Sequence, residues 1–147
     1  MKRLFQRIFL VALLFATATV HAEESWLPIA DEYGIEYFIN ESITFDDSDG
    51  EDGYLVWNQS IFKTKEVRNQ VMEKYQLSET PYYEKTCMKF NYYFSRAYIA
   101  TVIVYGASGK VLGSVNNTEC KFTPVKEGSV LKGYADAAKM ILEGKKW

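Results

Sequence analysis

Histidine occurs only once in this 147-residue sequence, as His21, which lies within the first 22 residues. Those residues form a leader that is removed if the chain is exported. The remaining chain then has no imidazole to act as a base for a serine or cysteine nucleophile, and none to bind a metal. The sequence therefore predicts a protein that is not an enzyme, with no catalytic, cofactor-binding or metal-binding residues.

Long hydrophobic runs are also missing, apart from one near the start. Residues 8–18 are apolar and follow the basic residues Lys2, Arg3 and Arg7, but this run is too short to cross a bilayer. With cleavage after Ala22, residues 1–22 are typical of a signal peptide, and an N-terminal membrane anchor is the alternative. We expect an exported protein, in the periplasm, at the cell surface or secreted. Its mature chain, residues 23–147, is expected to be a single domain without a membrane span.

A strong excess of positive charge is absent as well. The chain has 17 basic and 19 acidic residues, and three of the basic residues but none of the acidic ones lie in the leader. The mature chain therefore carries a formal net charge of −5, derived from those counts. A mildly acidic domain has no electrostatic footprint for nucleic acid or for anionic lipid, so neither is an expected partner.

Cysteine occurs only twice, as Cys87 and Cys120. Their spacing fits neither a CxxC redox motif nor a metal site, and an exported chain enters an oxidising compartment, so we expect a disulfide bond between them. The bond would stabilise the fold by roughly 4 kcal/mol. Two free buried thiols are the alternative. If Tyr105 pairs with Lys110, Cys120 lies opposite Ser95, and the chain must bend near residues 91–95 for the two sulfurs to meet.

The hydrophobic pattern predicts an α+β fold. Residues 96–105 are β-branched and aromatic, and a glycine-containing loop connects them to residues 110–115, which is typical of a hairpin. Alternation predicts further strands over residues 35–39, 42–45, 54–62 and 82–91. Residues 65–76 and 130–143 show helical spacing, the second behind Ser129 as N-cap. We expect a mostly antiparallel β-sheet of about six strands with the C-terminal helix packed on it.

The acidic segment from Asp46 to Asp52 resembles a calcium loop only at first sight. An EF-hand needs a glycine at its sixth position and a glutamate at its twelfth, and no register of this segment supplies the full ligand set. A solvated acidic turn is favoured because aspartate and glycine are standard turn residues, and cation binding is left open. Catalysis on a glycan by Asp46, Asp47, Asp49 or Asp52 is disfavoured, because catalytic carboxylates need a cleft and separated pKa values.

A set of short landmarks in chain order is similar to those of the bacterial surface-adhesin protein E family. The matching residues are Trp26, Tyr37-Phe38-Ile39-Asn40, Ser42-Ile43, Val56-Trp57, Cys87, the segment from Tyr105 to Val111, the segment from Phe122 to Val125, and Gly128-Ser129. The resemblance covers nearly the whole mature chain. It implies a dimer-forming, mostly antiparallel sheet with a packed helix, and binding to host matrix or serum proteins.

Two binding functions follow from these observations. The first is an exported, non-catalytic protein of the adhesin E type, consistent with eleven tyrosines and three tryptophans, because aromatic residues are enriched in interface cores. Tyr82, Tyr83 and Tyr93 are the expected exposed aromatics. The alternative is a periplasmic housekeeping or inhibitor protein that binds an envelope partner through an edge strand.

Overall fold

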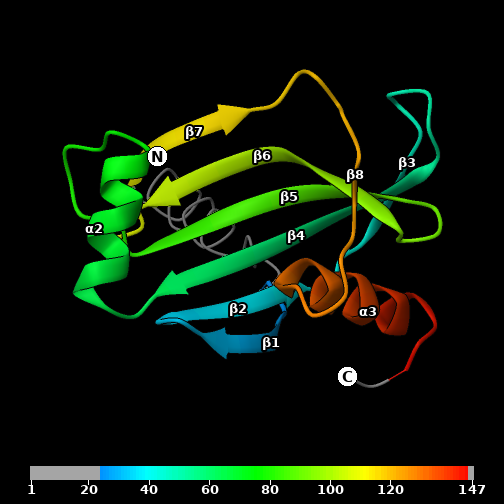
Figure 1. Ribbon diagram of the computed structural model, residues 1–147, viewed down its shortest axis with the longest axis horizontal. Helices are drawn as coiled ribbons and strands as arrows, with labels where there is room; N and C mark the ends of the chain where they lie inside the picture. The colour runs from blue at the N-terminus through cyan, green and yellow to red at the C-terminus, as the bar shows by residue number, and fades with distance from the viewer. Residues whose placement is uncertain (1–23, 146–147) are drawn as a thin grey trace, which may run out of the picture.

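The computed structural model describes residues 24–145, which form one antiparallel sheet and two helices (Figure 1). In chain order, the elements are β1 (Trp26–Glu32), β2 (Ile35–Asn40), β3 (Thr44–Asp46), β4 (Gly53–Phe62), α2 (Lys65–Lys74), β5 (Tyr83–Asn91), β6 (Arg96–Tyr105), β7 (Val111–Asn116), β8 (Thr123–Pro124) and α3 (Val130–Leu142). The predicted α+β class is confirmed.

The sheet runs β1-β2-β4-β5-β6-β7, and two short strands lie off this path, β3 beside β4 and β8 beside β6. The six strands of the path match the expected number, and β3 and β8 bring the total to eight. β1 is an edge strand, a position in which Pro28 is tolerated because proline has no backbone N–H to donate to a neighbouring strand. It is joined to β2 by Tyr33 and Gly34, both with positive φ, the geometry of a two-residue hairpin turn.

Alternation from Val56 to Phe62 of β4 separates the two faces of the sheet. Val56, Ser60 and Phe62 are buried, whereas Trp57 and Ile61 between them are only half-buried. We call the side of the sheet that carries Val56, Ser60 and Phe62 the helix face, and the side that carries Trp57 and Ile61 the open face. This alternation places the residues of each neighbouring strand on a defined side, because antiparallel partners share a face.

Helix α3 packs on the helix face next to β1 and β2, as Figure 1 shows. Its buried side chains form one core with Val56 of β4 and Phe90 of β5. Ser129 caps the helix, its hydroxyl accepting from the Lys132 backbone N–H, as the sequence predicts. Small side chains let the helix lie close to the strands. The buried core that results comprises Ile39, Val56, Phe90, Phe94, Ala97, Tyr134, Ala135, Ala137 and Ala138.

Two features of the hairpin region differ from expectation. Tyr105 pairs with Val111 rather than Lys110, because an irregularity shifts the β6–β7 register there. Further along, Cys120 lies in the connection between β7 and β8 rather than in a strand opposite Ser95. The predicted bend after β5 is present: the side-chain oxygen of Asn91 accepts from the backbone N–H groups of Ser95 and Arg96 and closes the turn.

Candidate functional site

The open face carries a hollow of about 540 Å³. Its walls are Trp26, Trp57, Ile103 and Tyr105, with Lys85, Glu24 and Glu41 among the polar groups of its lining. We call this set the aromatic groove. A concave site with aromatic walls and a few polar groups is the usual form of a ligand-binding surface.

The groove is assembled from residues far apart in the sequence. Trp57 stands in the middle of β4, opposite Cys87, and Lys85 in β5 pairs with Ile103 of β6. Trp26 reaches the groove from the edge strand β1. Tyr105 is held by its neighbour Tyr83, whose ring stacks on it with centroids 4.6 Å apart. Neighbouring strands therefore fix the walls, and a rigid sheet is a good support for a binding surface.

Lys85 occupies the centre of this arrangement. Its Nζ lies 5.4 Å from the ring centroid of Trp26 and 5.9 Å from that of Tyr105. The same atom forms an ion pair of 2.6 Å with Glu24. The hydrogen bond from Lys85 lowers the pKa of the Glu24 carboxyl below its ordinary value. The groove thus already stabilises an ammonium group between aromatic faces and a carboxylate.

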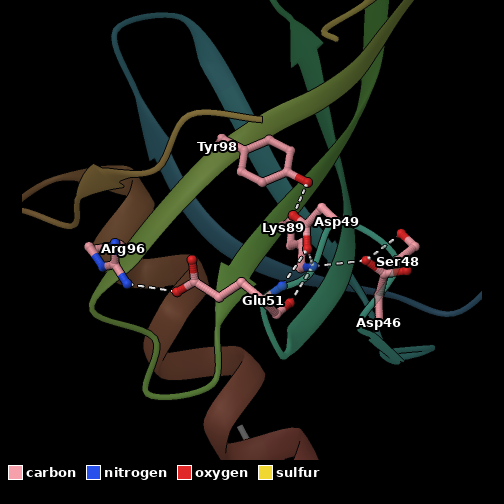
Figure 2. Close-up of polar contacts among 7 residues, drawn as sticks. All are labelled: Asp46, Ser48, Asp49, Glu51, Lys89, Arg96 and Tyr98. Carbon is pink, nitrogen blue, oxygen red and sulfur yellow. Dashed lines mark hydrogen bonds and ion pairs between the residues drawn. The ribbon is translucent and has the colours of Figure 1, made fainter. Parts of the chain in front are cut away.

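A second polar centre lies where the acidic segment folds back over the sheet (Figure 2). Lys89 of β5 is fully buried, and its Nζ lies 3.0 Å from a carboxylate oxygen of Asp46. The same atom donates to Asp49 and, at 2.7 Å, to the backbone oxygen of Glu51. Tyr98 completes the centre, its hydroxyl donating to Asp49 at 2.8 Å.

We call Lys89, Asp46, Asp49 and Tyr98 the lysine cluster. It bears on whether the acidic segment is a solvated turn or a cation site. The two carboxylates are not solvated, since their side chains are only 18 % and 12 % exposed. A lysine ammonium supplies the positive charge between them. Among residues 24–145, no group of histidine, cysteine, aspartate and glutamate side chains is arranged to hold a metal ion. The cluster closes the loop onto the sheet and is structural.

The electrostatics of Asp49 follow from this packing. Burial alone raises the pKa of its carboxyl, but hydrogen bonds from Lys89 and Tyr98 outweigh that effect and bring the pKa down to about 2. A carboxyl with a depressed folded-state pKa stabilises the fold above its ordinary pKa and loses that contribution as the pH falls towards the depressed value.

We therefore expect the stability of the protein to fall between pH 4 and pH 2 by about 1 kcal/mol through Asp49, after allowance for solvent screening in the loop. Urea unfolding at both pH values measures this. The Asp49→Asn variant is expected to lack that component. Asp47→Asn, at an exposed side chain of the same loop, is the matched control and should keep it. An unchanged acid dependence in Asp49→Asn would contradict the assignment.

The two cysteines do not form the expected disulfide bond in this structure. Both are free thiols: Cys87 is buried in β5 and Cys120 is exposed. Their surroundings differ, since Cys87 lies near Asp46, whereas the thiol of Cys120 lies beside the hydroxyl of Tyr98. A residue of the lysine cluster thus lies near each thiol. Burial raises the pKa of Cys87 to about 11.

These surroundings predict unequal thiol reactivity. At pH 8, only on the order of one Cys87 side chain in a thousand is a thiolate, and the thiolate is the reactive form. Iodoacetamide should therefore modify Cys120 alone in the folded protein, and Cys87 only after unfolding. Mass spectrometry of the intact and digested protein measures the adducts. Protection of both cysteines, released by a reductant, would show that the disulfide forms instead.

The tyrosines expected at the surface are not all exposed. Tyr93 is 76 % and Tyr82 is 36 % exposed, while Tyr83 is half-buried because it stacks on Tyr105. Tyr93 lines a second hollow of about 600 Å³ at the β5–β6 turn, next to the ion pair of Arg96 with Glu51. That hollow is largely formed by a turn and an acidic loop, so it lacks the strand support of the aromatic groove.

Sequence reasoning identified neither the groove nor the lysine cluster. Alternation places Lys85, Cys87 and Lys89 together on one side of β5, and this placement is confirmed. The sequence signal for the cluster was Lys89, a lysine within a predicted strand, combined with an acidic segment of opposite charge. The aromatic groove had no comparable signal, because its walls come from three different strands, β1, β4 and β6.

Comparison with known proteins leaves the assignment to the structure itself: no family model matches the chain, and neither a curated protein nor a solved structure is significantly similar to it. Among the described residues, no helix is long and apolar enough to cross a membrane. The proposed leader, residues 1–22, lies outside the described residues.

Proposed function

We propose that this protein is an exported, non-catalytic binding protein that holds a protein partner in the aromatic groove of its open sheet face. The observation that carries the proposal is the convergence of Trp26, Trp57 and Tyr105 around one hollow. Tryptophan and tyrosine are the residues most often found at energetic hot spots of protein interfaces. Positions in a stiff sheet keep their ordering cost on binding low.

Export is supported by the basic and apolar character of residues 1–22 and by the small residues before the cleavage point. The resemblance to the surface-adhesin protein E family supports a partner among host matrix or serum proteins. Retention in the periplasm would instead make an envelope protein the partner. Cell fractionation followed by detection of the mature chain distinguishes these two compartments.

A second binding mode is favoured by the other edge of the sheet. β7 has a free edge, and its side chains Val111 and Val115 are each 53 % exposed. A small hollow between Leu77, Val104 and Gly113 adjoins it. An extended segment of an envelope partner could add to this edge as a further strand, which is the mode expected of a periplasmic housekeeping or inhibitor protein.

The two modes are separated by comparing three immobilised baits: the wild type, Trp57→Ala and Val115→Lys. Trp57→Ala removes a wall of the groove, and Val115→Lys places a charge on the edge strand, which disfavours strand addition. If the groove is the site, a partner that binds the wild type saturably is lost by Trp57→Ala and kept by Val115→Lys. The opposite pattern assigns the function to β7 and overturns the groove proposal. Thermal melting of each bait controls for misfolding.

A further inference from the structure

We propose that the aromatic groove receives a basic side chain, lysine or arginine, from an extended segment of the protein partner. This inference rests on the proposed function, because it names the kind of side chain that the groove would recognise in the protein partner. Three observations support it: an internal ammonium that already sits in the groove, the excess of carboxylates in its lining, and an aromatic face left over for a second cation.

The internal ammonium shows what the groove stabilises. Lys85 Nζ lies over the rings of Trp26 and Tyr105 while it pairs with Glu24. Aromatic faces attract cations because the ring quadrupole places negative charge above and below the plane. Two ring faces and one carboxylate around a single ammonium form an environment suited to a cation.

The charge of the lining is negative even with Lys85 present. Glu24 and Glu41 both line the hollow, and Lys85 is the only basic side chain among its lining residues. The negative charge of Glu24 is compensated by its ion pair with Lys85. Glu41 accepts a hydrogen bond from the Ser25 hydroxyl, and within residues 24–145 it forms no ion pair. One carboxylate is therefore left to meet a positive charge from outside.

An aromatic face lines the same hollow as that carboxylate. Trp57 lines the same hollow as Glu41, and Lys85 lies over Trp26 and Tyr105 rather than over Trp57. A lysine or arginine side chain matches this pair, because its aliphatic stem can lie along Ile103 and the indole while its charged end reaches Glu41. A partner in extended conformation would present such a side chain out of its backbone and into the groove.

The probe for this inference is a capped five-residue peptide with lysine at its centre and small neutral neighbours. Matched peptides carry arginine, norleucine or glutamate at the same position. Binding is followed by the indole N–H signals of Trp26 and Trp57 in a ¹⁵N–¹H correlation spectrum, assigned with Trp26→Phe and Trp57→Phe variants. The lysine and arginine peptides are expected to shift the Trp57 signal saturably, and to bind at least about fivefold more tightly than the norleucine peptide.

The Glu41→Gln variant supplies the matched control, since it keeps the shape of the exposed side chain and removes its charge. It should weaken lysine-peptide binding roughly three- to tenfold, and raised salt should weaken wild-type binding in the same direction. Equal binding of the norleucine peptide, stronger binding of the glutamate peptide, or no shift with any peptide overturns the inference. None of these results decides the proposed function, which fails if Trp57→Ala keeps the partner.

Discussion

The Lys89→Met variant is expected to unfold with a free energy about 3 kcal/mol lower than that of the wild type. Lys89 is fully buried between Asp46 and Asp49. Methionine fills a similar volume but supplies no charge, so the two carboxylates would be left facing each other at a partly buried site. Removing one partner of a buried ion pair is costly because the remaining charges lose their compensation.

Lys85→Met is the matched control for this prediction. It is the same substitution on the same strand and face, but the ion pair of Lys85 with Glu24 is at the surface, with side-chain exposures of 22 % and 56 %. Exposed pairs contribute less than about 1 kcal/mol, so this variant should stay close to wild-type stability. Urea unfolding of both proteins at pH 7 makes the comparison. Equal losses in the two variants would refute a special role for Lys89.

A triple variant separates charge from packing. If Lys89→Met is combined with Asp46→Asn and Asp49→Asn, the two uncompensated charges disappear, and most of the lost stability should return. Failure of the triple variant to recover would show that the loss comes from the lysine stem and its packing. Figure 2 shows why recovery is expected: both aspartates converge on one ammonium, and the Tyr98 hydroxyl donates to Asp49.

The second large effect is expected at the start of β4, where Gly53→Ala should lower the free energy of unfolding by about 3 kcal/mol. A Cβ at this position would lie 2.1 Å from the backbone oxygen of Phe90 and 3.1 Å from Cε of Lys89. The backbone atom cannot move aside without disturbing the β4–β5 ladder, in which Gly53 pairs with Asn91. Overpacking against backbone has no inexpensive relaxation.

Gly113→Ala is the control, since Gly113 also lies within a strand and has no positive φ. A Cβ there would meet Leu77 Cδ2 at 3.5 Å, an ordinary contact. Its stability should change by less than about 1 kcal/mol. Thermal and urea unfolding of the two alanine variants give the comparison. A mild effect at Gly53 would mean that β4 and β5 are spaced more widely at that point than the structure has them.

Much of the fold was predictable from local patterns. Alternation along residues 54–62 and 82–91 predicts the strands β4 and β5, and Ser129 predicts the start of α3. The buried face of β4 was wrong: Leu55, Trp57 and Ile61 were expected to meet the core, but Val56, Ser60 and Phe62 are the buried residues. The N-cap of α2 was missed. Thr64 is the cap, and its hydroxyl accepts from the Val67 N–H. Threonine is a good capping residue, but the predicted strand ends so close to it that the start of the helix was not recognised. The β6–β7 register was also wrong, by one residue at Tyr105 and by two from Val104 onward, since a local irregularity in pairing leaves no mark on hydrophobic alternation.

The candidate site was less predictable for a physical reason. Trp26 and Tyr105 meet in the groove only because β1, β2, β4, β5 and β6 lie side by side in that order, and strand order depends on long-range pairing. The lysine cluster likewise joins residues about forty positions apart. Charge and alternation can propose which residues face outward, but not which of those residues become neighbours.

Hydroxyl-radical footprinting of the protein with and without its bound partner tests the central claim most directly. If the open face holds the partner, the side chains of Trp57, Ile103 and Tyr105 should become protected on binding. Leu142 on α3, which is 44 % exposed, should react equally in both states. Protection of α3 or of Val111 and Val115 on β7, with the groove residues unchanged, would contradict the account.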